Sequence, residues 1–312
     1  MIRYVTRRLL MLIPTILIIS FITFMMTHLA PGDPARLMAG MEATQQDVER
    51  IRKQLGLDKP LLQQYSIYLS KLFRGDMGTS IRSRRPVVQM IVERYPFTLY
   101  LALTGITIAL IISLIAGTLA AVYNNTIFDN LTMTLAIGGV SMASFWRGLM
   151  LMFLFSLVLG WLPASGAGES ISFFDNIRYL ILPGVTLGIG SAAYLTRLTR
   201  SNMLEVLNED YVTTARAKGL AEWRVIFKHS LRNALLPIIT MAGLQFGILL
   251  GGTVVIEKVF AWPGIGRLTV NSIFAKDFPV VQGCIMTYAI SFVLLNLFVD
   301  ILYTYINPKI RY

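Results

Sequence analysis

Hydrophobic residues follow one another in long, almost uncharged runs along this chain, and polar residues gather in the stretches between them. Six runs have about the 20 residues that a helix needs to cross the hydrocarbon core of a membrane. They cover residues 9–28, 97–122, 131–160, 179–196, 233–256 and 284–303. The pattern therefore predicts an all-α integral membrane protein with six transmembrane helices.

The first run requires a choice between a signal peptide and a retained helix. Arg3, Arg7 and Arg8 precede it, as basic residues precede a signal peptide. The run is about 20 residues long, however, whereas the apolar part of a signal peptide has about 7–15. The segment Pro31-Gly32-Asp33-Pro34 that follows has no small-residue cleavage site. We therefore expect a retained transmembrane helix.

The composition agrees with a membrane protein. Of the 312 residues, 55% are hydrophobic and 14% are charged, whereas soluble domains have about 45–50% and about 25%. Such a chain has too much apolar surface for intrinsic disorder. Its single cysteine, Cys284, excludes a disulfide scaffold.

The net charge of +11 is explained by topology. Residues 1–8, the loop 197–232 and the tail 307–312 together carry 12 basic residues, against four in the short loops opposite. The positive-inside rule then places both termini and this loop in the cytoplasm. The segment 29–96 becomes an extracytoplasmic insert. The basic residues thus indicate membrane lipid and topology rather than a nucleic acid partner.

The insert has its own helical pattern. Residues 42–55 predict an amphipathic helix ended by Gly56, and residues 63–73 predict a second helix. A turn follows at residues 75–78. The insert is either a small cap over the ends of the spans or a docking surface for an extracytoplasmic partner.

The cytoplasmic loop 197–232 is the most informative polar segment. A short helix over residues 211–218 is ended by Gly219, and a second helix begins near Ala221. Arg224, Lys228 and Arg232 recur at intervals of four along the second helix. It either lies on anionic lipid headgroups or docks on a cytoplasmic partner that exerts force on it.

Glycines and prolines recur inside the predicted spans. Gly243, Gly247 and Gly251 are spaced by four, which lets helix backbones approach closely. They form either an internal packing contact or a seam with another subunit or a gate. Pro237 lies one turn into the same span and is expected to kink it.

Another glycine pattern, Gly188-Ile-Gly190-Ser-Ala-Ala193, matches a dinucleotide-binding fingerprint by letter alone. That fingerprint requires a preceding strand, and here the residues lie within an apolar run. We therefore do not expect a nucleotide to bind here.

Two charged residues lie inside the apolar runs, where each requires a polar or charged group to interact with. Arg147 interrupts the third run, and an arginine at that depth costs about 2.5–3.5 kcal/mol on insertion scales. It lines a transport path, forms a structural pair, or marks a misplaced span boundary. Asp300, near the end of the sixth run, is expected to pair with Arg197 or Arg200.

Several enzymatic signatures are absent from the sequence. It contains no nucleotide-binding P-loop, no H-E-x-x-H zinc motif and no G-x-S-x-G nucleophile motif. His28 and His229 are its only histidines, and a cysteine-rich zinc site is excluded. We predict no catalytic residue, no metal site and no cofactor bound by this chain. A transport subunit or a membrane scaffold without a conduit then fits the sequence.

The loop motif resembles a known family. Tyr211-Val-Thr-Thr-Ala-Arg-Ala-Lys-Gly219, followed by His229-Ser-Leu-Arg-Asn-Ala-Leu-Leu-Pro237, is similar to the cytoplasmic signature of permeases from binding-protein-dependent ABC importers. Thr213, Thr214 and Ala215 stand where the general signature has Glu-Ala-Ala, which is typical of the peptide and nickel branch.

Further landmarks resemble the same branch over the whole length. They are Pro31-Gly-Asp-Pro34, Gly56-Leu-Asp-Lys-Pro60, Gly75-Asp-Met-Gly78, Phe260-Ala-Trp-Pro-Gly-Ile-Gly266 and Asn307-Pro-Lys-Ile-Arg311. The segments 34–37 and 243–247 most resemble glutathione-type and dipeptide-type permeases.

The resemblance implies a permease in the bacterial inner membrane that imports a dipeptide, oligopeptide or glutathione. A nickel or metal-chelate importer of the same branch is the alternative. The implied partners are a second homologous permease, an extracytoplasmic binding protein and two ATPase subunits that hold ATP and magnesium. The residues expected to couple this chain to the ATPase are Tyr211, Thr213, Thr214, Ala215, Ala217, Gly219 and Trp223.

Overall fold

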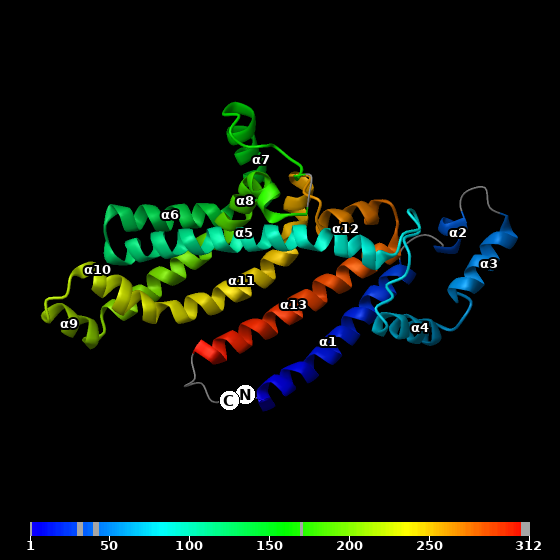
Figure 1. Cartoon of the computed structure of the whole chain (residues 1–312), viewed down its shortest axis with the longest axis horizontal. Coiled ribbons are helices and arrows are strands. Elements are labelled where there is room, and N and C mark those ends of the chain that lie inside the picture. The colour runs from blue at the N-terminus through cyan, green and yellow to red at the C-terminus, as the bar shows by residue number, and fades with distance from the viewer. Residues whose placement is uncertain (1, 30–33, 40–43, 169–170, 307–312) are drawn as a thin grey trace. The chain divides into compact units, whose positions relative to one another are not determined.

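The computed structural model describes residues 2–29, 34–39, 44–168 and 171–306. Within these ranges the chain is helical apart from turns, loops and an isolated bridge between Thr79 and Pro86 (Figure 1). The predicted all-α fold is thereby confirmed. Residues 31–33 of the predicted turn and the predicted tail 307–312 lie outside the described residues.

Long helices alternate with short ones along the chain. In order they are α1 (Ile2–Leu29), α2 (Pro34–Ala39), α3 (Gln45–Leu55), α4 (Leu61–Phe73), α5 (Val87–Val122), α6 (Ile127–Ser141), α7 (Ser144–Met152), the π-helix η1 (Phe153–Val158), α8 (Phe173–Leu207), α9 (Asp210–Ala217), α10 (Glu222–Arg224), the π-helix η2 (Val225–Leu231), α11 (Arg232–Val259), α12 (Ile265–Phe274) and α13 (Phe278–Ile306).

The chain divides into two compact units. One comprises Phe97–Pro263 with Leu294–Tyr312, and the other comprises Ile2–Pro96 with Gly264–Val293. The long helices α5 and α13 each contribute to both units. The first unit contains most of the predicted site residues, and we call it the core unit.

The described helices include several membrane spans. Those long and apolar enough are Val87–Val122, Phe173–Leu207, Glu222–Val259 and Phe278–Val299. The bent pair of α6 with α7 and η1 adds a fifth if it is one span. In α1, the described apolar stretch Ile13–Met26 is shorter than these four.

The third predicted span, residues 131–160, is divided by a bend. Helix α6 ends at Ser141, Met142 has an extended backbone, and α7 begins at Ser144. The two arms are bent by 105°. The sequence predicted one span because residues 141–144 do not interrupt the apolar run. The backbone nevertheless bends there, and we call this bend the elbow.

Helices α5 and α8 approach each other closely within the core unit. A Cβ on Gly188 would lie 2.9 Å from the carbonyl oxygen of Gly105, and a Cβ on Gly184 would lie 2.6 Å from the Thr104 side chain. Helices approach this closely only where side chains are small. Leu101, Leu180 and Leu195 are buried in the same unit and form part of its hydrophobic core.

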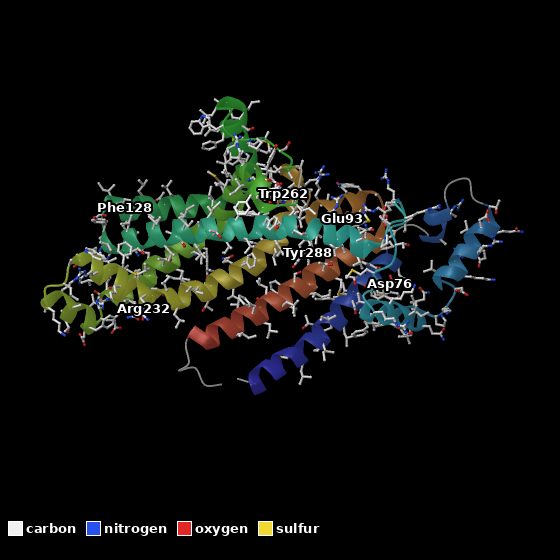
Figure 2. All side chains as sticks on the ribbon, viewed as in Figure 1. Asp76, Glu93, Phe128, Arg232, Trp262 and Tyr288 are labelled. Carbon is white, nitrogen blue, oxygen red and sulfur yellow. The ribbon has the colours of Figure 1, made fainter. Side chains whose placement is uncertain are left out.

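Trp262 closes one end of this hydrophobic core. It is fully buried, and its indole Nε1 donates a hydrogen bond of 2.8 Å to the carbonyl oxygen of Phe97 (Figure 2). Its ring meets the Phe97 ring edge-on, with centroids 5.6 Å apart. Near it the Glu257 carboxylate, also buried, accepts a hydrogen bond of 2.7 Å from Thr98.

The second unit contains the segment predicted as an insert. Helix α3 begins with a capping box between Thr44 and Asp47 and ends at Gly56, whose φ of 69° is left-handed. The predicted glycine end of this helix is confirmed. The buried carboxylate of Asp277 accepts hydrogen bonds from the Ser80 hydroxyl and the Ile81 backbone, which fixes the turn before α5.

Candidate functional site

The loop between α8 and α11 is a compact group of short helices. Helix α8 continues to Leu207, so the polar loop begins about ten residues later than the sequence predicts. Helices α9 and α10 lie beyond the ends of α8 and α11 (Figure 1). We call residues 208–231 the coupling loop.

The turn within the coupling loop depends on Gly219. Its φ of 75° lies in the left-handed region, which glycine adopts without steric cost. Its backbone N–H donates a hydrogen bond of 2.9 Å to the carbonyl oxygen of Arg216, closing α9. Among the residues that the structure describes, a Cβ at Gly219 would meet no atom within 4 Å. The left-handed backbone therefore favours glycine at this position, although a larger side chain would not clash with the described residues.

The coupling loop has a small apolar centre of its own. Val212, Ala215 and Val225 are buried together, with Leu207 and Leu220 packed against them. These contacts hold α9 against η2 and the end of α8. Ala215, one of the seven predicted coupling residues, therefore supports the loop from inside.

The other six predicted coupling residues are exposed. They are Tyr211, Thr213, Thr214, Ala217, Gly219 and Trp223. The Trp223 side chain is 60% exposed, with the Arg224 guanidinium 5.2 Å from its ring centroid. An exposed indole in a polar loop gives a large apolar surface that a partner protein can cover.

Polar contacts fix the loop's shape. Arg216 and Glu222 form an ion pair of 2.7 Å across the Gly219 turn, and the hydrogen bond that Arg216 donates to the Glu222 carboxylate raises the pKa of Arg216. Asn233, on α11, donates a hydrogen bond of 2.7 Å to the Tyr211 hydroxyl on α9. The loop is thus connected to the start of α11, near Arg232 (Figure 2), as well as to α8.

Arg147 lies on α7, immediately after the elbow, and is 9% exposed. Its Nε donates to the carbonyl oxygen of Thr186 at 3.2 Å, and its Nη1 donates to the carbonyl oxygens of Gly139 and Met142. Gly190 leaves room for the guanidinium, since a Cβ there would lie 3.0 Å from Nη2. The arginine joins α7, the end of α6 and the middle of α8.

Asp129 and Arg200 form a second charged contact in the core unit. The Asp129 side chain is 2% exposed, and Arg200 donates to both of its oxygens, at 2.7 Å from Nη2 to Oδ2. Arg200 also donates a hydrogen bond of 2.8 Å to Asn124. Asp129 is not among the residues predicted from the sequence, although Thr126 three residues earlier is a helix-capping signal that places it in the first turn of α6.

Arg200 has a partner that the sequence did not indicate. The predicted pairing of Asp300 with Arg197 or Arg200 stays a prediction, because the Asp300 side chain lies outside what the structure describes. Asp129 is 71 positions away along the chain, which no helical spacing indicates.

The glycines of α11 have different surroundings. A Cβ on Gly243 would lie 2.5 Å from the Val299 side chain, so Gly243 packs within the core unit. Gly247 is also buried, whereas a Cβ on Gly251 would meet no described atom within 4 Å. Pro237 lies inside α11.

The fingerprint-like glycines of α8 are used for packing. Gly188 faces the backbone of Gly105, and Gly190 faces Arg147. Both residues lie within the continuous helix α8, whereas the glycines of a dinucleotide-binding fold follow a β-strand. In the part of the chain that the structure describes, no three His, Cys, Asp or Glu side chains gather to hold a metal ion.

Comparison with known proteins agrees with the loop motif. Residues 113–312 match the family described as binding-protein-dependent transport system inner membrane component, and residues 1–102 match its N-terminal component. The chain is 50% identical to the glutathione transport system permease protein GsiC of Escherichia coli K12, over 100% of both chains. It is 49% identical to the protein of that name from Shigella boydii, over the same coverage.

A solved structure shows the same fold at greater evolutionary distance. It is described as an amino acid ABC transporter with histidines, and it matches with a TM-score of 0.50 and 15% identity. The match covers 71% of this chain and 94% of that one. With family matches that together cover nearly the whole length, this chain belongs to the inner membrane components of binding-protein-dependent ABC importers, whose ATPase sites lie on partner subunits.

Proposed function

We propose that this permease subunit imports glutathione or a short peptide across the bacterial inner membrane. The observation that carries the proposal is the 50% identity, over the full length of both chains, to permeases of glutathione transport systems. A binding protein would deliver the substrate from outside. A second permease subunit would complete the path.

The coupling loop is the proposed seat of the ATPase partner. Its exposed residues Tyr211, Thr214 and Trp223 offer a surface, and its buried residues give that surface a fixed shape. ATP and magnesium would be held by two partner ATPase subunits. When these close, movement of the loop would pass into α8 and α11 and expose the path to alternate sides of the membrane.

The proposed topology follows from the basic residues. Both termini and the coupling loop would lie in the cytoplasm, and the segment 29–96 would lie outside. Seven of the 28 basic residues occur in the predicted loop 197–232.

Two residues of α11 are proposed to act in packing or gating. Gly251 would face the second permease, and Pro237 would kink the helix.

The substrate assignment is tested by uptake of radiolabelled glutathione. Bacteria from which the gene is deleted should lose uptake, and a plasmid carrying the wild-type gene should restore it. Excess unlabelled glutathione should compete, and unlabelled dipeptides show whether the system also accepts peptides. Unchanged uptake in the deletion strain, with other glutathione importers removed, would exclude glutathione as the substrate.

A further inference from the structure

Two charged contacts hold α6 against α8 at opposite ends of α6. At its start, the buried Asp129 receives Arg200 of α8 through two hydrogen bonds. A bidentate pair of this kind fixes both distance and orientation. The Asp129 carboxylate also accepts a hydrogen bond of 3.0 Å from the Asn125 backbone, which positions it in the turn before α6.

The second contact lies where α6 ends. The last carbonyl groups of a helix have no partner within the helix and carry partial negative charge. Arg147 donates to the Gly139 and Met142 carbonyls there and to the Thr186 carbonyl of α8. Its positive charge is thus matched by helix-end dipoles, and a single side chain fastens the elbow to α8.

A groove of about 350 Å³ lies between the two helices. Its lining includes Met133, Ala136 and Ile137 of α6 and Tyr194 and Arg200 of α8. Near the elbow the helices approach closely, since a Cβ on Gly139 would lie 3.7 Å from that of Ala193. The two charged contacts therefore add fixed polar attachments at both ends of α6 to the apolar packing along it.

We propose that α6 and α8 move as one body during transport, held by the Asp129–Arg200 pair and by Arg147. Helix α8 leads directly into the coupling loop, so this body carries the loop's movement to the elbow. Arg147 is then a positioning residue of the elbow and does not contact the substrate. This inference rests on the proposed function of the coupling loop as the seat of the ATPase.

An engineered disulfide tests the proposal directly. The 3.7 Å between Cβ atoms of Gly139→Cys and Ala193→Cys suits a disulfide, which needs about 3.5–4.5 Å. The pair is introduced into a Cys284→Ala background, since Cys284 is the only native cysteine. If α6 and α8 move as one body, the oxidised importer keeps its uptake of labelled glutathione within about twofold of the reduced importer. Loss of uptake on oxidation, recovered on reduction, would overturn the proposal.

The same disulfide distinguishes a role of Arg147 in positioning the elbow from a role in contacting the substrate. Arg147→Gln keeps hydrogen-bonding capacity but loses the charge and reach, and should lower uptake about tenfold at an unchanged membrane level. Oxidation of the cysteine pair in the Arg147→Gln protein should restore uptake, because the disulfide replaces the lost fastening. If Arg147 contacts the substrate, oxidation restores nothing.

If the Arg147→Gln protein does not accumulate in the membrane, the Asp129–Arg200 pair allows the same experiment with a second variant. Asp129→Asn should also lower uptake about tenfold, and oxidation of the cysteine pair should again restore it. Glu93→Gln is the matched control, since it removes an exposed ion pair with Arg85 and should leave uptake unchanged. Absence of rescue in the Asp129→Asn protein would contradict the proposal.

A final measurement is independent of the substrate. The rate of disulfide formation is compared in membranes holding the intact importer, without nucleotide and after trapping with ATP and vanadate. Equal rates are expected if the two helices move together, and a large difference would overturn the proposal. If the wild-type importer takes up no glutathione, the substrate assignment fails, while this comparison still reports on the helices.

Discussion

At the scale of single residues, Gly219 combines a left-handed backbone with open space around its Cβ position. Gly219→Val should be strained by about 1–2 kcal/mol in that conformation. We expect a normal membrane level, since the loop is a small local structure, but loss of uptake with ATP hydrolysis no longer linked to transport. Uptake and ATPase activity measured on the same membranes check this.

Gly219→Asn is the matched control, because asparagine tolerates the left-handed region far better than valine. The Asn protein should retain most of its uptake if backbone conformation is what matters. Equal loss in both variants would show instead that the partner leaves no room for any side chain at this position.

Trp262 supports a second prediction at this scale. Trp262→Phe removes the indole donor to Phe97 and part of a fully buried ring. The free energy of unfolding should fall by about 1–3 kcal/mol, because a buried hydrogen bond is lost and the smaller ring leaves a cavity. Thermal unfolding of the detergent-solubilised protein measures it, and an unchanged midpoint would contradict the assigned role of the hydrogen bond.

At the scale of helices, the contact between α5 and α8 depends on glycine. A methyl group at Gly188 would lie 2.9 Å from the backbone oxygen of Gly105 and from Ile108, so the helices would have to separate. Gly188→Ala should lower the free energy of unfolding by about 1–3 kcal/mol, the usual cost of overpacking. The same thermal unfolding experiment detects it.

The control for this change is Gly138→Ala on α6, where a Cβ meets no atom within 4 Å in the described part of the chain. Alanine favours the helix over glycine by up to about 1 kcal/mol, so this protein should be equally or more stable. A similar loss in both variants would show that helix packing is not the cause.

At the scale of the whole molecule, the exposed face of α11 is expected to meet the second permease. Gly251→Leu adds a side chain where the chain itself offers open space. The isolated subunit should fold normally, but less of the second permease should copurify with it. Gly138→Leu, an equal change in size on α6, should leave copurification unchanged, and normal assembly of the Gly251→Leu protein would exclude this face.

Much of this fold follows from the sequence because a membrane-spanning helix is recognised from the hydrophobicity of consecutive residues. Apolar runs located the long helices α5, α8, α11 and α13, although the sequence placed their ends several residues from those observed. The elbow was missed because Ser141, Met142 and Ala143 interrupt the helix without interrupting the apolar run. A backbone bend between two apolar segments leaves no mark in a hydropathy pattern.

The sequence by itself determined the family, the membrane-embedded helices and the loop that carries the family's motif. These depend on local composition and on residues adjacent along the chain. Only the tertiary structure decided that Arg200 pairs with Asp129, that Arg147 is bound to backbone carbonyls, and that Gly190 leaves the space for it. Thr186 is 39 positions from Arg147, and Asp129 is 71 positions from Arg200, so packing of the helices, rather than any spacing in the chain, brings these partners within hydrogen-bond distance.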